Sequence, residues 1–425
     1  MALVLQAATV LTVDAGDRLL RDVDIRIEGN AITAIGPGLQ RAGDTVLDCR
    51  RGLVMPGLVN VHTHAATALF RGLAEDLPRE FWAGAYKVPG EARFGPGDYA
   101  LSLRAACAEF LANGVTCIAD RLAGMDRLAP VIEQSGLRAV VGSTLTEARA
   151  EAAWAETERL LERYGTNPAT SRVTAGVAPH ALDSCSDALL AESARRARAV
   201  GARVFLHVAQ SAPEVAAVRA RGHAGALACL RAAGLTGPDV VAAHALYLDE
   251  AEIEGWCADG TAIAHCPASN LKIEARTLSL HRFAGRVPVG LGTDWTASDN
   301  SMDMFWEARL AALVGKMNAG DPTALPVRTM IRMMTIEGAR VLGLDHLIGS
   351  VEAGKRADLI VLDLDRLEMA PPHDLAANVL YSASPRSVRD VIVEGVIRKR
   401  DHALVDVAEA TLVEQMRAAG WAQET

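Results

Sequence analysis

Between Pro56 and about Leu347, short apolar segments alternate with segments of helical spacing, and this alternation limits the fold more than any other feature of the chain. Eight apolar segments read as strands: Leu58–His64, Val115–Asp120, Arg138–Leu145, Val173–His180, Arg203–Gln210, Val240–Tyr247, Thr261–Pro267 and Val287–Asp294. Helical patterns between them include Tyr99–Asn113, Ser186–Gly201, Glu214–Gly234 and Leu248–Gly260. Because alternating strands and helices form parallel sheets, the pattern predicts an α/β fold, a closed (β/α)8 TIM-like barrel over residues 57–348.

An open, doubly wound sheet would show the same local alternation. Such a sheet usually carries a glycine-rich phosphate-binding turn directly after its first strand. No such sequence follows Leu58–His64. The closed barrel is therefore the favoured interpretation.

The two ends of the chain have a different texture. Segments that alternate at period two near the amino terminus are Ala8–Val13, Val23–Ile27 and Ala31–Ile35. They are separated by turns and predict a small antiparallel sheet. After Gly349 the expected elements are strands at Leu359–Asp363 and Val388–Val396 and a helix at Val405–Ala419. We expect residues 1–56 and 349–425 to form one small flanking β-sandwich domain with a C-terminal helix.

Charge and cysteine content exclude several classes of function. The formal net charge is −9 and the chain has no cluster of lysine and arginine, which argues against binding to nucleic acid or to an acidic membrane surface. No apolar run approaches the length of a membrane span, and residues 1–6 lack the pattern of a signal peptide. The seven cysteines are scattered, without CxxC spacing. This pattern predicts reduced thiols and a cytoplasmic protein.

Metal-competent side chains gather at the ends of the predicted strands. They are His62, His64, His180, His207, His244, His265 and Asp294. In a barrel of this kind the carboxyl ends of all strands open onto one face, where active sites lie. His62 and His64, two apart on one strand, project to the same side and can share one metal ion. The pattern predicts a metal site at the barrel mouth.

Six motifs carry a resemblance to a known family. They are Pro56–His64, Arg71–Leu77, Ala178–His180, Ala264–Lys272, Gly292–Asp294 and Gly349–Leu359. With these motifs the chain resembles the amidohydrolase superfamily, in its branch of adenosine-, guanine- and triazine-type deaminases and chlorohydrolases. It looks most like methylthioadenosine/S-adenosylhomocysteine deaminases and triazine hydrolases. The resemblance covers nearly the whole chain.

The resemblance implies one divalent metal ion, zinc with iron(II) as the alternative, held by His62, His64, His207 and Asp294. Three neutral imidazoles and one carboxylate agree with this, since they leave the ion a bound water whose pKa falls to roughly 7. Asp294 would accept the proton of that water, and His244 would hydrogen-bond the hydroxide or the developing oxyanion. The implied reaction is hydrolysis of a cyclic C–N bond, a deamination of a heteroaromatic compound by metal-bound hydroxide.

Position 210 departs from the family pattern. The deaminases usually carry a glutamate three residues after the third metal histidine, where this chain has Gln210. An amide donates a hydrogen bond but cannot deliver a proton. Gln210 is therefore a candidate for both catalysis and substrate binding, and it favours hydrolysis of a ring amide or a ring C–Cl bond as an alternative. A second alternative is a non-catalytic relative that only binds a ligand.

Further candidate substrate contacts are His180, Phe81, Trp82 and Arg121. Phe81 stands where relatives acting on adenosine thioethers carry a glutamate, and Glu80 takes that place if the alignment shifts by one residue. Arg121 is predicted either to clamp a carboxylate or ring oxo group or to form a rim salt bridge, for instance with Glu147.

The aromatic residues Phe81, Trp82, Trp295, Phe305 and Trp306 suit a flat heterocyclic substrate, although loop packing explains Phe305 and Trp306 equally well. His265 is expected to be structural. The resemblance also implies a homodimer or a larger homo-oligomer.

Overall fold

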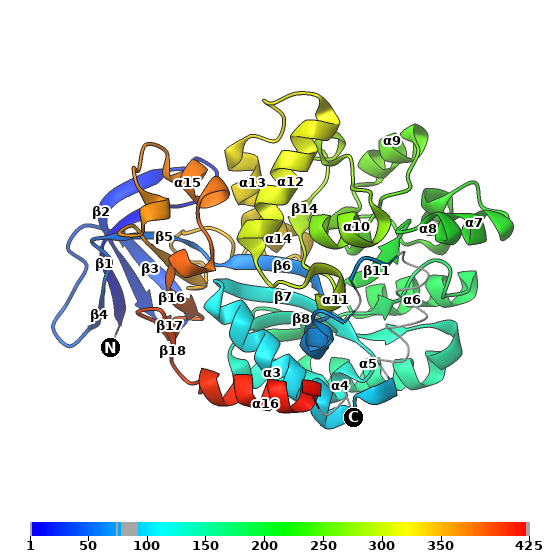
Figure 1. Cartoon of the computed structure of the whole chain (residues 1–425), viewed down its shortest axis with the longest axis horizontal. Helices are drawn as coiled ribbons and strands as arrows, with labels where there is room; N and C mark the ends of the chain where they lie inside the picture. Colours follow the sequence, from blue (N-terminus) through cyan, green and yellow to red (C-terminus); the bar gives the residue numbers. More distant parts are fainter. Residues whose placement is uncertain (1, 74, 78–91, 422–425) are drawn as a thin grey trace.

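The computed structural model describes residues 2–73, 75–77 and 92–421, and its centre is a barrel of parallel strands (Figure 1). The barrel strands are β6 (Leu58–Thr63), β7 (Val115–Leu122), β8 (Arg138–Leu145), β9 (Val173–Ala175), β10 (Ala178–Pro179), β11 (Val204–Val208), β12 (Val240–His244), β13 (Ala262–His265) and β14 (Val289–Leu291). β9 and β10 together occupy the predicted strand Val173–His180. All pairings between these strands are parallel.

Backbone hydrogen bonds close the ring of strands at two points. The amide of His207 donates to the carbonyl of His180 at 3.0 Å, which joins β11 to the end of β10. The amide of Asp294 donates to the carbonyl of His62 at 3.0 Å, which joins the segment after β14 to β6. The predicted barrel is thus present, and its closure already brings site residues from distant segments side by side.

Helices surround these strands in Figure 1. They are α3 (Pro96–Ala112), α4 (Met125–Ser135), α5 (Ala150–Tyr164), α6 (Asp187–Ala199), α7 (Ala212–Ala220), α8 (Ala226–Ala233), α9 (Glu250–Asp259), α10 (Pro267–Glu274), α11 (Thr296–Asp299), α12 (Met304–Ala319), α13 (Val327–Met333) and α14 (Ile336–Val341). Short 3-10 turns are η1 (Ala65–Phe70), η3 (Glu147–Arg149), η4 (Leu280–Arg282), η5 (Leu367–Met369) and η6 (Pro385–Ser387). Among the described residues, no helix combines the length and the apolar character needed to cross a membrane.

One predicted helix is wrong in its extent. The pattern Glu214–Gly234 forms two helices, α7 and α8, rather than one. The chain leaves α7 at Gly222, whose φ of 92° lies in the left-handed region that glycine adopts without steric cost. Hydrophobic spacing continues across this break, so the pattern alone did not reveal it.

The interior of the barrel is filled by buried apolar side chains. Val59, Val61, Ala119 and Val241 belong to a buried apolar cluster that also contains residues of α14, among them Ala339. The same cluster includes the larger Phe205, and together these side chains fill the barrel, as in other barrels of this type. The polar residues of the strand ends therefore stand on a rigid, dry base.

Strands from both chain ends form a second sheet. In the described residues it has nine strands in the order β18-β17-β16-β15-β5-β1-β2-β3, with β4 paired to β1. Their bounds are β1 (Leu3–Leu11), β2 (Leu19–Glu28), β3 (Ala31–Gly36), β4 (Thr45–Asp48), β5 (Gly52–Pro56), β15 (Leu359–Asp363), β16 (Val388–Val393), β17 (Val396–Arg400) and β18 (Ala403–Leu404). Helices α15 (Leu375–Tyr381) and α16 (Glu409–Trp421) complete the tail, and α16 lies beside α3 (Figure 1).

Two expectations for this sheet need correction. The amino-terminal strands are not purely antiparallel, because β1 pairs with β4 and β5 in parallel. The predicted strand Val388–Val396 is a hairpin of β16 and β17, turned at Glu394 and Gly395, which both have positive φ. A tight turn with left-handed residues needs no polar loop, so the apolar run continues through it.

Candidate active site

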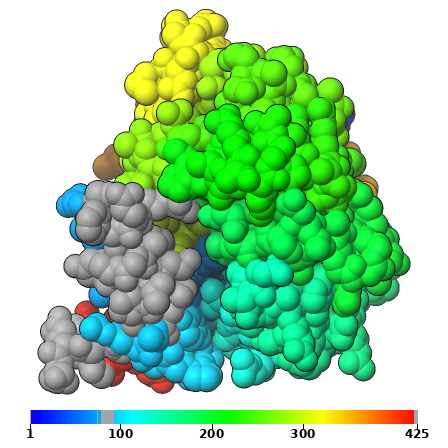
Figure 2. Space-filling model, turned by 90° about the vertical axis from the view of Figure 1, so that its right-hand side faces the viewer, coloured from blue at the N-terminus to red at the C-terminus, as the bar shows by residue number. Residues whose placement is uncertain are grey.

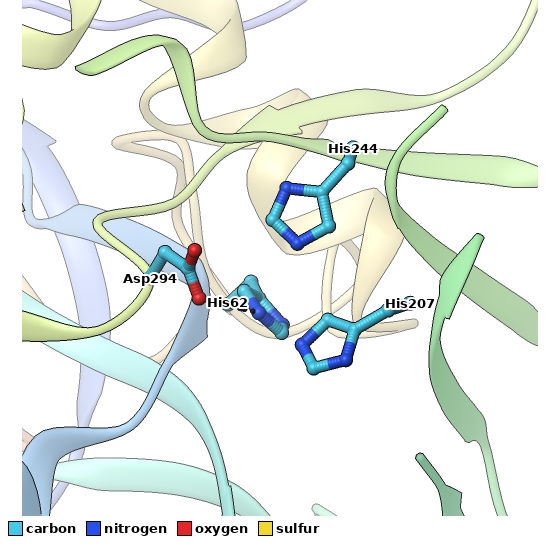
Figure 3. A group of neighbouring side chains, drawn as sticks. All are labelled: His62, His207, His244 and Asp294. Carbon is cyan, nitrogen blue, oxygen red and sulfur yellow. Dashed lines mark hydrogen bonds and ion pairs between the residues drawn. The ribbon is translucent and has the colours of Figure 1, made fainter. Parts of the chain in front are cut away.

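Four predicted site residues meet at the carboxyl ends of the barrel strands (Figure 3). His62 lies on β6, His207 on β11 and His244 at the end of β12, while Asp294 follows β14. One ligand atom of each of the four lies within 4.8 Å of the others, and all four residues are buried. Segments far apart in the sequence therefore converge on a single point.

His64 lies directly beside this group. Its Nε2 is 3.4 Å from Asp294 Oδ1, and its Nδ1 is 2.8 Å from the carbonyl oxygen of Arg121. Because a carbonyl only accepts, Nδ1 carries the hydrogen and the lone pair of Nε2 points toward Asp294. All four predicted metal ligands are thus in one cluster, with His244 as its fifth member.

Burial sets the charge state of the imidazoles. It lowers the pKa of His62 to about 3 and lowers the pKa of His244, and it holds the pKa of His207 well below the ordinary value, where nearby Arg121 acts in the same direction. For Asp294, burial alone raises the pKa, but the adjacent rings of His62 and His64 hold it well below its usual range.

Neutral imidazoles grouped around a carboxylate are the donor set of a zinc or iron(II) site. His244 Nε2 is buried and has no hydrogen-bond partner in the described part of the chain. An additional partner at the centre of the cluster would satisfy this atom. The residues present therefore fit a divalent metal ion.

The backbone is unusual where the strands deliver these side chains. His244 and Asp294 have φ of 78° and 58°, and Ala209, between His207 and Gln210, has φ of 48°. Non-glycine residues seldom adopt this left-handed region, and such strain gathers at functional sites because the surrounding structure enforces it. The strand ends are bent to aim side chains into the mouth.

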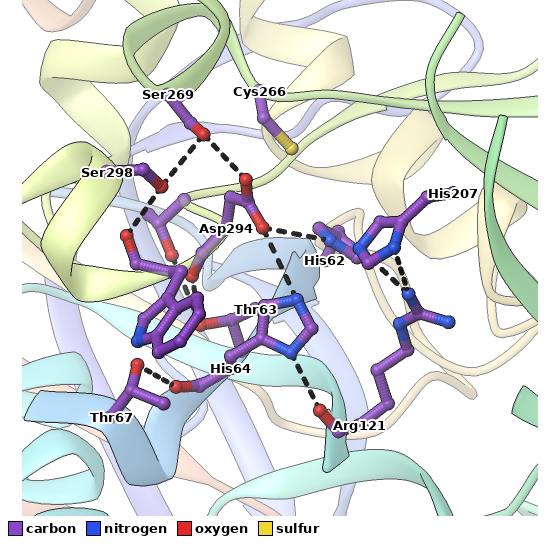
Figure 4. Close-up of polar contacts among 12 residues, drawn as sticks. His62, Thr63, His64, Thr67, Arg121, His207, Cys266, Ser269, Asp294 and Ser298 are labelled. Carbon is purple, nitrogen blue, oxygen red and sulfur yellow. Dashed lines mark hydrogen bonds and ion pairs between the residues drawn. The ribbon is translucent and has the colours of Figure 1, made fainter. Parts of the chain in front are cut away.

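Two site residues that we did not single out lie in the first turn of α10. Ser269 Oγ donates to Asp294 Oδ2 at 2.6 Å and lies 2.8 Å from Ser298 Oγ (Figure 4). Asn270 Oδ1 is 2.8 Å from His244 Nδ1. Both residues belong to the motif Ala264–Lys272, so their place in the sequence was visible although their contacts were not.

The contacts of Arg121 contradict both predicted roles, the clamp on a substrate group and the salt bridge at the rim. Its guanidinium donates to the carbonyl oxygens of Pro179, His180 and Phe205 at 2.8, 3.0 and 3.3 Å, and Nη2 lies 2.5 Å from Nδ1 of His207. Only 2% of the residue is exposed. The side chain points into the barrel rather than to its rim, so it binds strand ends instead of a substrate carboxylate.

The predicted ion pair of Arg121 with Glu147 is wrong. The carboxylate of Glu147 accepts the backbone N–H of Ser186 at 3.0 Å instead. The physical reason is the alternation along β7, which directs residue 121 inward and away from the loop that carries Glu147.

Gln210 lies at the mouth, 8% exposed, and a buried carboxylate holds its backbone. Glu214 accepts the backbone N–H of Ala209 at 3.0 Å and that of Gln210 at 2.8 Å. This use of Glu214 was missed, although a carboxylate four residues beyond Gln210, at the start of a helix, was a signal for it. Glu214 fixes the loop that presents Gln210.

Of the other residues predicted to contact the substrate, His180 lies beside His207. The His180 ring centroid lies 4.9 Å from that of His207, and His180 Nδ1 is 2.8 Å from Ser184 Oγ. Phe81 and Trp82 lie outside the described residues. The Trp295 ring is buried, 6.4 Å from that of His64.

Phe305 packs in the main core and Trp306 is 44% exposed on α12, so neither is brought to the group of four. His265 is buried and is not part of that group; burial lowers its pKa to about 3.

The face that carries α6, α7 and α8 is hollowed. Figure 2 shows blue and olive atoms at the floor of this hollow, between the cyan and green segments. These colours correspond to the chain near residue 60 and near residue 300. The hollow thus leads toward the segments that carry His62 and Asp294.

A second group of metal-competent side chains consists of Asp187, His223 and Cys229, on and between α6, α7 and α8. The guanidinium of Arg221 is 3.4 Å from Asp187 Oδ1 and 3.5 Å from Cys229 Sγ. A cation already neutralises this group, which makes it a poor metal site.

A sequence profile described as the amidohydrolase family matches residues 53–398. The chain belongs to the amidohydrolase family. The predicted resemblance is thereby confirmed, and the matched range contains every member of the cluster at the mouth.

Relatives and solved structures agree with this assignment. The 5'-deoxyadenosine deaminase of Methanosarcina mazei is 36% identical over 424 residues, covering 98% of this chain and 97% of that protein. The 5-methylthioadenosine/S-adenosylhomocysteine deaminase of Pelotomaculum thermopropionicum is 37% identical, covering 98% of each chain.

An adenosine deaminase from Xanthomonas campestris with bound zinc matches with a TM-score of 0.93 and 33% identity, over 98% of this chain and 97% of that one. A zinc complex of atrazine chlorohydrolase from Arthrobacter aurescens TC1 has a TM-score of 0.91 at 23% identity, over 98% and 100% of the two chains. The second likeness shows the fold alone.

Proposed function

We propose that this amidohydrolase is a metal-dependent aminohydrolase that removes the exocyclic amino group of an adenosine-type nucleoside. The observation that carries the proposal is the convergence of His62, His207, His244 and Asp294, with ligand atoms within 4.8 Å of one another. The names of the relatives that are 36% and 37% identical, both deaminases of adenosine derivatives, support the substrate class.

We propose zinc as the metal, with His62, His64, His207 and Asp294 as its ligands. Bound there, a divalent ion would supply Lewis-acid chemistry that makes water nucleophilic near neutral pH. Neutral, buried imidazoles suit such an ion because no proton competes for their lone pairs.

In this proposal, Asp294 accepts a proton from the attacking water and returns it to the leaving amine. His244 hydrogen-bonds the oxygen that adds to the ring, and His180 contacts the heterocycle. Gln210 donates a hydrogen bond from its amide to a ring nitrogen and so polarises the carbon under attack. Phe81 and Trp82 stay candidates for contact with the substrate.

Hydrolysis of a ring amide or of a C–Cl bond was the alternative favoured by Gln210. The relatives that are more than 30% identical are named deaminases, so the comparisons do not favour this alternative. A protein that only binds its ligand is not favoured either, because the whole predicted ligand set converges.

The test is metal analysis of the purified protein combined with ammonia release from a panel of 5'-deoxyadenosine, 5'-methylthioadenosine, S-adenosylhomocysteine, adenosine, guanine and an aminotriazine. We expect about one zinc per chain and ammonia from at least one adenosine derivative. Asp294→Ala is the control and should release none. Zinc binding without turnover of any panel member would contradict the proposal.

We further propose a homodimer or larger homo-oligomer in the cytoplasm. Exposed apolar side chains on α12, among them Leu313 and Met317, support association, and the unpaired state of all seven cysteines, which lie in the described part, supports a reducing compartment. The strands of residues 1–56 and 349–425 are proposed to fold as a small β-sandwich domain beside the catalytic barrel of residues 57–348.

A further inference from the structure

His244 is held from behind by a neutral side chain. Asn270 Oδ1 lies 2.8 Å from His244 Nδ1, and both residues are 0% exposed. Asn270 belongs to the first turn of α10, which starts at Pro267, and the neighbouring Ser269 is bonded to Asp294. One helical turn thus supports the imidazole and the carboxylate together.

The chemistry of this contact specifies one form of the ring. A carbonyl oxygen of an amide can only accept, so the hydrogen of a neutral imidazole must lie on Nδ1. The lone pair then lies on Nε2, which is buried and has no hydrogen-bond partner within the described residues. Figure 3 shows the His244 ring turned toward His207, His62 and Asp294.

We propose that Asn270 is a positioning residue that fixes the tautomer and the orientation of His244, so that the Nε2 lone pair faces the reacting centre. Its catalytic consequence rests on the role of His244 in the proposed function. The tautomer itself does not depend on that role.

The state of Asn270 supports a specific task rather than general packing. Its Nδ2 has no hydrogen-bond partner in the described part of the chain, so the contact with His244 is the side-chain bond that the structure assigns to it. A buried amide that is only half satisfied is costly, and an apolar residue would fill the same space at lower cost. An apolar residue at position 270 could not accept a hydrogen bond from His244, and Asn270 can.

The test is the tautomeric state of His244, read by long-range ¹⁵N–¹H correlation on zinc-loaded protein labelled at histidine. The ring signals are assigned with His244→Gln. We expect the Nδ1–H form in the unaltered protein and in Asn270→Asp, which keeps an acceptor oxygen. In Asn270→Ala we expect the Nε2–H form to become populated. Asn378→Ala, in α15, is the matched control and should change nothing.

Activity gives a second readout. With a substrate from the panel, Asn270→Ala should lower kcat about 10- to 100-fold with little change in KM and an unchanged zinc content. Finding the Nε2–H form in the unaltered protein would overturn the proposal. So would a folded Asn270→Ala variant that keeps both the Nδ1–H form and its kcat. If Asn270→Ala does not fold, the spectra of the unaltered protein and of Asn270→Asp decide. If no panel member is turned over, the spectra still judge this inference separately from the proposed function.

Discussion

At the mouth of the barrel, a few buried side chains are held in defined charge states by their neighbours. Burial keeps the imidazoles of His62 and His244 neutral, whereas the adjacent histidine rings keep Asp294 ionised in spite of its burial. Two further residues, Gln210 and Asp120, allow this arrangement to be tested. One concerns the reaction and the other concerns stability.

Gln210→Glu should leave the zinc content unchanged and speed the release of ammonia from adenosine derivatives. A carboxyl group can protonate a ring nitrogen, whereas an amide cannot, and a positioned acid contributes roughly 10²- to 10⁴-fold. The measurement is kcat/KM on the panel, with Gln210→Ala as the control that only removes the side chain. A variant with full metal content and unchanged kcat/KM would contradict the proposed role of residue 210.

Asp120 should make stability depend on pH. Burial raises its pKa to about 7 from 3.8, and a hydrogen bond from the Ala65 amide opposes this only in part. Because the folded state holds the proton more tightly, the free energy of unfolding should fall as pH rises from about 4 to 7. Between pH 5 and pH 8 this amounts to about 2 to 3 kcal/mol.

In Asp120→Asn this contribution should vanish. The free energy of unfolding of the variant, measured relative to the unaltered protein, should therefore be higher at pH 8 than at pH 5. Urea unfolding at both pH values measures the effect, and the exposed Asp183→Asn serves as control. If the variant and the unaltered protein differ in their free energy of unfolding by the same amount at both pH values, a raised pKa for Asp120 is ruled out.

At the scale of elements, the strands of the barrel were predictable because each is a short apolar run bounded by turn residues. β8 in the barrel and β15 in the flanking sheet coincide with their predicted ranges, the predicted strand Val173–His180 is interrupted between β9 and β10, and the other barrel strands differ only at their ends. The break between α7 and α8 was not predictable, since one glycine in the left-handed region interrupts an otherwise continuous hydrophobic spacing. Strand direction in β1, β4 and β5 depends on tertiary pairing, which local periodicity does not record.

The same limit applies to the site. The ends of the predicted strands indicated seven candidate residues at the mouth, because the carboxyl ends of barrel strands share one face. The resemblance to the family then implied His62, His64, His207 and Asp294 as the metal ligands. The contacts of Arg121 were not predictable, since its partners are backbone carbonyls, which every residue carries. Their position depends on how three strand ends meet.

Buried ion pairs of Arg138 join the barrel to the flanking sheet. Arg138, at the start of β8, donates to Asp358 at 2.8 Å and to Glu394 at 2.9 Å, and the side chains of Arg138 and Asp358 are each 1% exposed. Asp358 also accepts the amide of Glu394 at 2.9 Å. The motif Gly349–Leu359 thus contributes Asp358, which forms the buried ion pair with Arg138.

Asp358→Ala should lower the free energy of unfolding by about 3–5 kcal/mol, because it leaves a buried guanidinium without its main partner. Asp48→Ala, which breaks the exposed pair with Arg50, should cost less than about 1 kcal/mol. Urea unfolding compares the two. Zinc content should stay unchanged in both, and similar losses in the two variants would contradict the importance of the buried pair.

At the scale of the whole molecule, a metal ion would tie together segments that the chain separates widely. His62 and Asp294 lie on neighbouring strand ends, whereas His207 lies on β11, further round the barrel, so an ion that binds all three stabilises only the folded state. At a free zinc concentration 100-fold above the dissociation constant, the gain is about 2.7 kcal/mol.

Calorimetry of protein stripped with a chelator should therefore show a lower Tm, which zinc restores. His207→Ala should keep the low Tm at the same zinc concentration, while His373→Ala, an exposed control, should respond like the unaltered protein. A Tm that is indifferent to zinc would argue against a metal site at the mouth.

The sheet that unites the chain ends has a consequence for biosynthesis. Arg51, beside β5, pairs with Asp365, 314 positions later, and β5 itself pairs with β15. A growing chain on the ribosome completes the sequence of the barrel while one edge of β5 still lacks its neighbour. Such an unpaired edge can recruit other chains, so the nascent protein passes through a stage at which a chaperone that shields β5 would raise the yield of folded enzyme.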